Sequence, residues 1–408
     1  MSSSNSAGSA AARRLLCLCL FVSIFSEVLL SPFYPQFFEK VFSINGTAFT
    51  GFFIFACRLA VMISTPIWGK LSQKIGTSRL FLIALGCSPF FSGALAFANT
   101  PALFLFITVL MLTVKSSLLL IYPLLAETNG AASTSRHYQL LFHGAIISAS
   151  ICGAVVMMHQ SPERVFLLLA LIDALLFLLL WVSRAKLPVS PVRIEKKRKF
   201  QRAGLGIPVV MFFLFGAAVF AFHLGNNVIR PYFTLYAENT FFTETFMSSI
   251  LFMLPNAAAL LVMPWMHKWV TKNNALSFSV LAVFILSVTL FIQWGVSALW
   301  LFAAARVLYG VFLASGQAAI DASFFHRQNA GNTSYAYSLL LLFQNAALLT
   351  APLAAAYTAS AAGHAVPFLA GALILMGAFA ALYHLSGENQ KIESPYYSNA
   401  GKRKEDIT

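Results

Sequence analysis

Long apolar runs, separated by short polar segments, dominate the chain. Each run holds about 20 mostly apolar residues, the length that an α-helix needs to cross a bilayer. The first six runs lie near residues 15–38, 47–68, 80–98, 101–125, 137–158 and 164–183. The second six lie near residues 207–236, 244–266, 275–294, 297–320, 333–358 and 365–385. Because the runs lack the alternation of barrel strands, the pattern predicts an all-α membrane protein with twelve transmembrane helices.

Composition agrees with this pattern. Of the 408 residues, 59% are hydrophobic and only 10% are charged, which a soluble domain could not bury in its core. The first run is too long for a cleaved signal peptide and lacks a small-residue cleavage pattern, so we expect it to be retained. The five cysteines fall inside predicted spans without metal-ligand spacing, and we expect them to pack as apolar side chains.

Lysine and arginine are concentrated on one predicted side of the membrane. The strongest concentration is the segment 184–206, whereas the predicted outer loops hold only Lys40 and Arg164. Under the positive-inside rule this distribution places both termini in the cytoplasm. The same topology explains the net charge of +14, so no nucleic-acid partner is expected. The expected partners are the lipid bilayer and a small solute, and we expect a monomer.

The basic segment divides the chain into two halves that contain an internal repeat. Ser31-Pro32-Phe33-Tyr34 is matched about 200 residues later by Arg230-Pro231-Tyr232-Phe233, and Pro66-Ile67-Trp68 is matched by Pro264-Trp265-Met266 at a similar separation. Parallel repeats of this kind place a solute site at the repeat interface near the bilayer midplane. The predicted organisation is a disordered cytoplasmic N-terminus at 1–12, helix bundles at 13–183 and 207–386, a basic cytoplasmic linker at 184–206, and a cytoplasmic tail at 387–408.

The segment between the second and third runs carries a motif. Gly69-Lys70-Leu71-Ser72-Gln73-Lys74-Ile75-Gly76-Thr77-Ser78-Arg79 resembles the signature loop of the major facilitator superfamily, G-x-L-x-D-[RK]-x-G-x-[RK]-[RK]. Glycines at these positions permit a tight turn and a close approach of helices. The resemblance implies the fold of this superfamily, with two six-helix bundles related by pseudo-two-fold symmetry, and the activity of a secondary transporter.

The motif departs from the family pattern at one position. Its acidic residue is Gln73 here, so the charged latch that this loop forms in the family's outward-open state lacks its carboxylate. We hypothesise that Glu127, at the cytoplasmic end of the fourth run, supplies a carboxylate to Lys74 or Arg79. The predicted latch residues are Gly69, Gln73, Lys74, Gly76, Arg79 and Glu127.

Charged residues inside the predicted spans are the main functional candidates, because a charge in lipid is costly and usually lines a cavity or forms a pair. In proton-coupled drug antiporters of the superfamily, a cation in span four works with a carboxylate in span one, and Lys115 with Glu27 looks similar. The resemblance implies that Glu27 and Lys115 couple transport to protons. The alternative is a static Glu27–Lys115 ion pair. We interpret Asp173, in the sixth run, as a helix-packing contact.

Three arginines are candidate solute contacts. Arg306 begins an R-x-x-x-G sequence that resembles a span-four motif of the family, here in the second half of the chain. Arg230 precedes a proline at a helix bend, where a guanidinium can grip a carboxylate or phosphate, although it could also snorkel to the interface or pair with Glu238. Arg58 either contacts solute or pairs with Glu27, since buried charges are paired.

Uncharged polar side chains form a second set of candidates. His143 and the pair Gln344 and Asn345 occupy related positions of the two repeats, and a histidine in a span is also compatible with simple packing. Asn226 and Asn227 lie about one helical turn before Arg230. The second set comprises His143, Gln344, Asn345, Asn226, Asn227 and Tyr34.

Cations outnumber carboxylates among these residues, which favours an anionic or carboxylate-bearing solute such as a metabolite or a metal chelator of the siderophore type. No cofactor is expected, and the proton gradient is the expected energy source. The small-residue spacing from Gly144 to Gly153 resembles an antiporter motif without its proline, so export is favoured and uptake by symport stays open.

Two alternatives remain. One is a multidrug/proton antiporter for lipophilic compounds, and the other is a non-transporting membrane receptor or scaffold on the same fold. An enzyme is not expected, because the sequence has no nucleophile–base set, and an ATP-driven pump is disfavoured because no phosphate-binding loop occurs. The short loops favour a bacterial cytoplasmic (inner) membrane.

Overall fold

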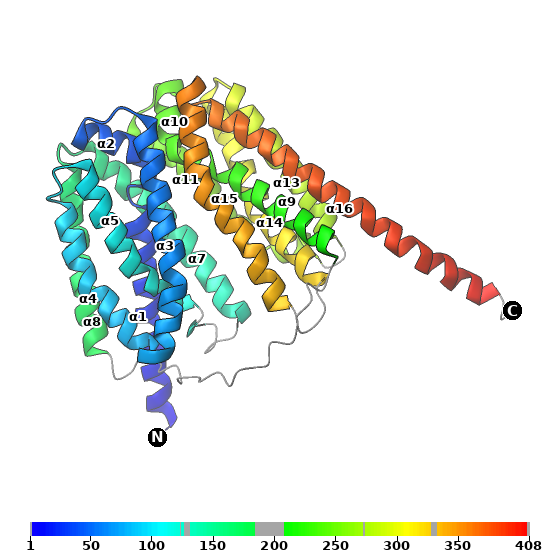
Figure 1. Cartoon of the computed structure of the whole chain (residues 1–408), viewed down its shortest axis with the longest axis horizontal. Helices are drawn as coiled ribbons and strands as arrows, with labels where there is room; N and C mark the ends of the chain where they lie inside the picture. The colour runs from blue at the N-terminus through cyan, green and yellow to red at the C-terminus, as the bar shows by residue number, and fades with distance from the viewer. Residues whose placement is uncertain are drawn as a thin grey trace. The chain divides into compact units, whose positions relative to one another are not determined.

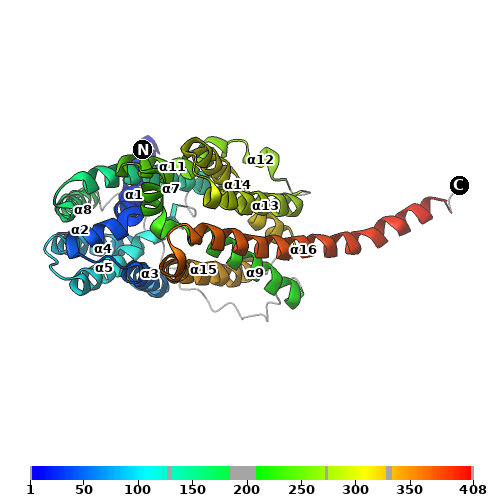
Figure 2. The same ribbon diagram turned by 90° about the horizontal axis from the view of Figure 1, so that it is seen from above.

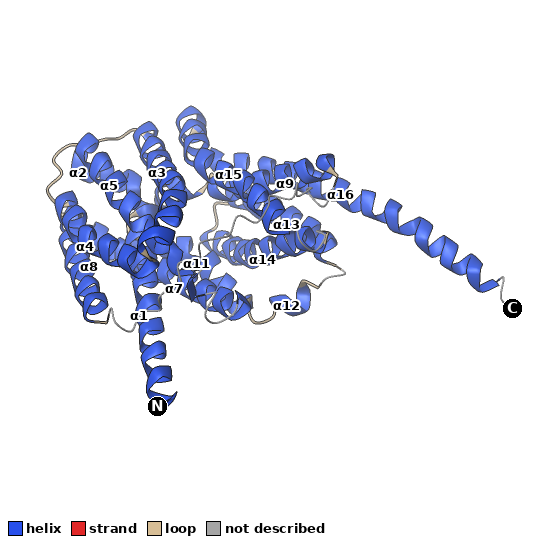
Figure 3. Cartoon of the chain, turned by 60° about the horizontal axis from the view of Figure 1, so that its bottom comes forward, coloured by secondary structure: helices blue, strands red, loops and turns tan. Residues whose placement is uncertain are grey.

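The computed structural model describes residues 2–122, 124–125, 131–183, 208–271, 274–327 and 333–405, and these form helices and connecting turns (Figure 3). Twelve segments are long and apolar enough to cross a membrane. They are Arg13–Phe42, Thr47–Ile75, Thr77–Leu95, Pro101–Leu120, His137–Met158, Pro162–Val182, Val209–Phe241, Thr245–Val262, Ala275–Gly295, Leu299–His326, Leu339–Ala362 and Val366–Gly387. The all-α class and the twelve predicted spans are therefore confirmed.

Several spans consist of more than one helical element. Those of the first half are α1 (Ser2–Val28), η1 (Ser31–Phe33), α2 (Tyr34–Phe42), α3 (Thr47–Ile75), α4 (Thr77–Leu95), α5 (Pro101–Lys115), η2 (Ser116–Leu120), α7 (Ala131–Met158), η3 (Pro162–Arg164) and α8 (Val165–Val182). Those of the second half are α9 (Val209–Asn227), η5 (Arg230–Tyr232), α10 (Phe233–Phe241), α11 (Thr245–Val262), α12 (Met266–Trp269), α13 (Ala275–Gly295), α14 (Leu299–His326), α15 (Thr333–Ala362) and α16 (Val366–Glu405).

The sequence repeat reappears as a structural repeat in the first and seventh spans. In both, a long helix ends, a 3₁₀ turn containing a proline follows, and a nine-residue helix completes the span. Pro32 and Pro231 lack an N–H group and cannot continue an α-helical hydrogen-bond ladder, which explains the interruption. The short helices also end alike, at Ser43 (φ 57°) and Phe242 (φ 50°), both left-handed.

The signature segment forms the end of α3 and the turn into α4. Gly76 has φ +87° and ψ 140°, a conformation that is essentially restricted to glycine, and its N–H donates to the Ser72 carbonyl over 2.9 Å. The tight turn expected from the motif is thus confirmed at Gly76. The close helix approach expected at its other glycine is not found, because a Cβ on Gly69 would meet no described atom within 4 Å.

Residue contacts divide the chain into two compact units. The first comprises Met1–Lys199, Arg230–Leu260 and Pro352–His364. Within it α4 packs against α5 and α8, and α1 packs against α7 (Figure 1). One core of this unit is rich in phenylalanine, and Phe33, Phe37, Phe38, Phe53 and Phe104 are almost fully buried in it.

Three contacts tie the second-half segments into the first unit. The Tyr232 hydroxyl donates to the Thr47 carbonyl over 2.6 Å. Gly51 of α3 lies so close to α15 that an added Cβ would be 2.5 Å from the Ala356 Cβ. The Ser249 hydroxyl of α11 donates to a carbonyl of α7 over 2.6 Å. The first compact unit therefore combines segments from both sides of the predicted linker, which itself lies outside the described residues.

The second unit comprises Phe200–Ile229, Leu261–Ala351 and Ala365–Thr408. In this unit α13 packs against α14 and α16, and α16 packs against α9 (Figure 2). The α9–α16 contact depends on two small residues, since a Cβ on Gly225 would lie 2.9 Å from the Gly371 carbonyl oxygen. The α16 helix continues beyond its span to Glu405, through the predicted tail, and α1 begins at Ser2, within the segment predicted to be disordered.

Candidate functional site

A buried ion pair lies inside the first unit. The Lys115 ammonium, at the end of α5, is 2.8 Å from the Asp173 carboxylate on α8, and the two side chains are 5% and 3% exposed. The static Glu27–Lys115 ion pair, considered as an alternative from the sequence, is not formed in this structure, whereas the proposed coupling role of the two residues stays a prediction. The physical reason is that Asp173 offers a carboxylate already surrounded by hydrogen-bond donors within the bundle.

One oxygen of the Asp173 carboxylate, Oδ2, receives three polar contacts. The Ser88 and Ser92 hydroxyls of α4 both donate to Oδ2, the latter over 3.0 Å. These serines lie one turn apart and face α8 from the same side of α4. The interpretation of Asp173 as a helix-packing group is consistent with this geometry, but Lys115 was not expected as its partner. Satisfied in this way, both charges can exist inside an apolar bundle.

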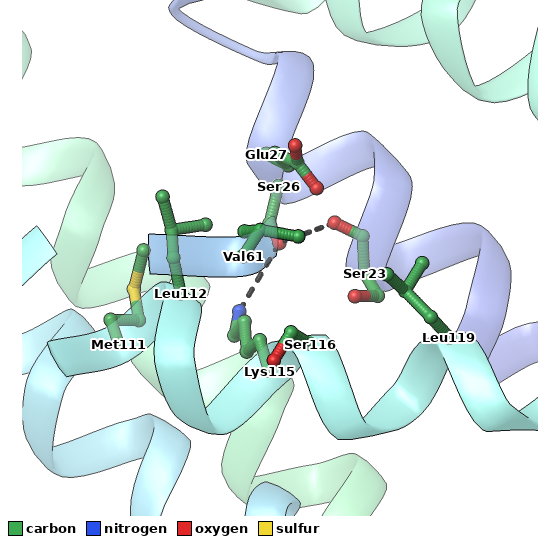
Figure 4. Close-up of a pocket in the computed structure, with 9 residues that line it drawn as sticks. All are labelled: Ser23, Ser26, Glu27, Val61, Met111, Leu112, Lys115, Ser116 and Leu119. Atoms are coloured by element: carbon green, nitrogen blue, oxygen red, sulfur yellow. Dashed lines mark hydrogen bonds between the residues drawn. The ribbon is translucent and has the colours of Figure 1, made fainter. Parts of the chain in front are cut away.

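Glu27 lies beside this pair but outside it. A small pocket is lined by Glu27, Ser23 and Ser26 of α1, by Val61 of α3, and by residues of α5 and η2 that include Lys115 (Figure 4). The Lys115 ammonium donates to the Ser26 hydroxyl over 3.1 Å, and that hydroxyl donates to the Ser23 carbonyl over 3.0 Å (Figure 4). The pocket has a volume of about 20 Å³, enough for about one water molecule and too small for an organic solute.

Glu27 and Arg58 act electrostatically on the same two residues, Tyr34 and Cys57. Both side chains are exposed at their positions on α1 and α3. Within the described part of the chain neither has an oppositely charged group within ion-pair distance, so the Arg58–Glu27 pair considered from the sequence is not formed. Tyr34 packs its ring against Phe38 and Phe53, with centroids 5.6 Å and 4.9 Å away.

The first and seventh spans meet through a polar cluster. The Gln36 amide donates to the Thr234 hydroxyl over 3.0 Å and to the Glu238 carboxylate over 3.3 Å. The Ser248 hydroxyl donates to the other Glu238 oxygen over 3.0 Å. Arg230, at the start of η5, lies with its guanidinium carbon 5.8 Å from the ring centroid of Phe252. Gln36 was not among the predicted site residues. Its polar side chain five residues after Ser31, the first residue of the proline-containing turn, was the signal in the sequence that could have identified it.

His143 of α7 contacts the second half of the sequence. Its Nδ1 lies 3.1 Å from the Asn256 side-chain oxygen on α11, in the first unit. The predicted relation between His143 and the pair Gln344 and Asn345 joins residues of different units. Gln344 is half-buried and Asn345 is exposed on α15.

The polar candidates of the second unit are largely occupied within it. The Tyr309 hydroxyl donates to the Asn226 side-chain oxygen over 2.8 Å, and the Arg306 guanidinium carbon lies 5.3 Å from the Tyr309 ring centroid. Arg306 and Asn226 are each only 4% exposed. The Asn227 amide donates to the His223 carbonyl over 2.8 Å within α9. Their predicted solute contacts are not tested by this arrangement and stay predictions.

The latch candidates that the structure describes lie on both sides of the turn at Gly76. Gln73 and Lys74, at the end of α3, and Arg79, in the first turn of α4, are exposed. Glu127, proposed as the substitute carboxylate, lies outside the described residues. Among the residues that are described, no group of three or more His, Cys, Asp or Glu side chains has the arrangement of a metal site.

Comparison with known proteins adds to this picture. The family model for the Major Facilitator Superfamily matches residues 16–293, and no curated protein matched the chain. The nucleoside transporter NupG is 14% identical, with 91% of this chain and 99% of that chain covered at a TM-score of 0.66. The human organic anion transporter MFSD10 (TETRAN) is 15% identical, with 92% and 99% covered at 0.66. The POT family transporter PepTSo is 12% identical, with 94% and 98% covered at 0.70.

Proposed function

This chain belongs to the major facilitator superfamily, and on that premise we propose that it is a proton-coupled secondary transporter of a small organic anion. The observation that carries the proposal is the buried Lys115–Asp173 pair beside a small pocket that is lined by Lys115 and by the exposed carboxylate of Glu27. Ionisable groups within membrane spans are costly and usually serve transport or proton transfer. The family and the twelve apolar spans make the chain an integral, multi-pass membrane protein with a transporter fold.

In the proposed mechanism the three ionisable groups have different roles. Lys115 and Asp173 are a fixed, mutually neutralised pair, because each is buried and hydrogen-bonded. Glu27 is exposed, lines the small pocket and follows Ser26, the residue that accepts the Lys115 hydrogen bond. It is therefore the group positioned to exchange protons through that pocket. This assigns proton exchange to Glu27 and makes Lys115 a positioning residue rather than its ion-pair partner.

The charge of Glu27 also determines how proton and solute are linked. An ionised Glu27 repels an anionic solute, whereas protonation removes that repulsion and leaves the nearby Arg58 charge available. Proton and anion should therefore bind together rather than compete. Such positive linkage corresponds to symport, the alternative that the sequence left open, and on this argument we propose symport with the inward proton gradient as the energy source.

The anionic solute class rests on charge and on one likeness. In the first unit, the exposed guanidinium of Arg58 accompanies Glu27, while the nearby Lys115 charge is already neutralised. A guanidinium can bind a carboxylate through two parallel hydrogen bonds. MFSD10 is an organic anion transporter, which agrees with this class, although at 15% identity the likeness itself concerns the fold.

A panel of ligands tests the solute class. Purified protein is heated in detergent with di- and tricarboxylates or with lipophilic cations such as tetraphenylphosphonium. Ligand binding to the folded state raises Tm, and we expect the carboxylates alone to do so. Arg58→Gln should abolish most of this shift, whereas Lys70→Gln, the removal of another exposed cation on α3, should preserve it. Stabilisation by the cations and not by the carboxylates would instead establish the multidrug alternative.

A further inference from the structure

A second, much larger cavity lies in the first unit, with a volume of about 510 Å³. It is lined by α1 residues from Arg13 to Phe21, by Tyr122 and Leu125 after η2, and by α7 residues from His137 to Leu141. None of these residues lines the Glu27 pocket. A volume of this size is typical of a site for a small organic molecule. This cavity can therefore hold a ligand that is too large for the Glu27 pocket.

The charged groups of this cavity are of one sign. Arg13 and Arg14 contribute two guanidinium groups, and His137 adds a group that is charged when protonated. Among the described residues that line the cavity none is a carboxylate. Guanidinium groups bind carboxylates, sulfonates and phosphates with matched, two-point geometry. The cavity is therefore electrostatically complementary to an anion.

The remaining wall is aromatic and aliphatic. The rings of Tyr122 and Tyr138 meet edge to face with centroids 4.8 Å apart, and this contact joins the segment after η2 to α7. Phe21 lines the cavity from α1, together with leucines such as Leu20 and Leu141. Aromatic faces in an ordered arrangement bind a flat or apolar body over a large area. The guanidinium groups and the aromatic wall of the cavity together favour a ligand with an anionic head and an apolar body.

We propose that this cavity is a binding site for an amphipathic anion, which its arginines hold by a carboxylate, sulfonate or phosphate head and its aromatic wall holds by an apolar body. The site does not depend on proton coupling at Glu27. Two sources offer this chemistry. One is a free organic anion, and the other is the headgroup and upper chain of an anionic phospholipid, which juxtamembrane basic residues attract.

Binding of 2-naphthoate to the full chain in phosphatidylcholine nanodiscs tests the site, with the uncharged 2-naphthamide as the matched ligand. We expect 2-naphthoate to bind at least tenfold more tightly than the amide. The double variant Arg13→Gln/Arg14→Gln should lose this preference, and the double control Lys70→Gln/Lys268→Gln, which removes two exposed cations outside the cavity, should keep it. Equal affinity for the two ligands, or an unchanged preference in the arginine variant, would overturn the proposal.

A second pair of variants keeps the test independent of topology, since Arg13 and Arg14 also contribute to the positive-inside signal. Arg13→Lys/Arg14→Lys retains both charges but loses two-point geometry, so binding should weaken by a smaller factor. Leu141→Trp alters no charge and occupies part of the cavity beside the aromatic wall, so it should weaken binding of both ligands while Tm is retained. Full binding by Leu141→Trp would also contradict the assignment.

Lipid composition distinguishes the two sources of the anion. The titration is repeated in nanodiscs in which phosphatidylglycerol replaces part of the phosphatidylcholine. If the headgroup occupies the site, phosphatidylglycerol weakens 2-naphthoate binding to the wild type but not to the arginine variant. If a free anion is the ligand, the wild-type affinity is unchanged by this lipid. Either result supports an amphipathic-anion site and names its source.

Discussion

At the scale of single residues, the decisive feature is that one intramembrane cation already has a partner. Lys115 is 2.8 Å from Asp173 and donates a hydrogen bond to Ser26, so its charge is neutralised within the first unit. Glu27 is left as the exposed carboxylate of the neighbouring pocket. In the proposed mechanism the pair has a structural role, and Glu27 is the group that exchanges protons.

Substitution of Asp173 tests the structural role. Asp173→Asn leaves the Lys115 ammonium buried without its counter-charge, and breaking a buried pair in this way costs about 3–5 kcal/mol. We expect a marked fall in Tm, measured in detergent. The double variant Lys115→Met/Asp173→Leu removes both charges and should recover most of the lost stability, since the two sites are directly coupled. A double variant no more stable than Asp173→Asn would argue against the pair.

The sequence predicted these residues better than it predicted their contacts. Glu27, Lys115 and Arg58 stand out because each interrupts an apolar run. The partner of Lys115 was not predicted for two reasons. The family resemblance implies a carboxylate in the first span, and a single sequence does not show that Ser88 and Ser92 face Asp173. Serine is common in membrane helices, so neither position indicates a polar contact until the packing of α4 on α8 is known.

At the scale of helical elements, the repeat and the turns were the most predictable features. The proline turns at Pro32 and Pro231 interrupt equivalent spans, and the structure shows the same order of elements after each. Hydrophobic length alone located the spans, because a bilayer imposes that length on every helix that crosses it. The extents of α1 and α16 were not predicted, since polar ends of helices carry no such constraint.

Two glycines of the signature segment provide a matched test of the turn. Gly76→Ala places a Cβ at φ +87° and ψ 140°, where a non-glycine residue costs of order 1–3 kcal/mol, so Tm should fall. Gly69→Ala, in the helical part of α3 and with no described atom within 4 Å of the new Cβ, should leave Tm unchanged or raise it slightly. The comparison is made by thermal melting of the two variants. Equal losses of Tm would show that the turn conformation is not what requires glycine at position 76.

At the scale of the whole molecule, the fold class could be predicted from the apolar length of the spans, and the family was established by the match to its family model. The twelve spans were readable from hydropathy, and the family model over residues 16–293 agrees with the signature motif. The composition of the first compact unit could not be predicted from the sequence. Gly51, Tyr232 and Ser249 join segments that are far apart in the sequence, through contacts specific to this conformation. No local pattern encodes such pairings.

In the proposed mechanism, Glu27 in the first span couples solute movement to protons. Uptake of a carboxylate identified by the thermal panel is measured in proteoliposomes with and without an imposed pH gradient, acidic outside. For wild type we predict a several-fold faster uptake under the gradient. Glu27→Gln should transport at a rate that does not respond to the gradient, while the control Glu39→Gln, at an exposed carboxylate of α2, should respond as wild type does. A Glu27→Gln variant that remains gradient-driven, or a wild type that ignores the gradient, would contradict the proposed coupling.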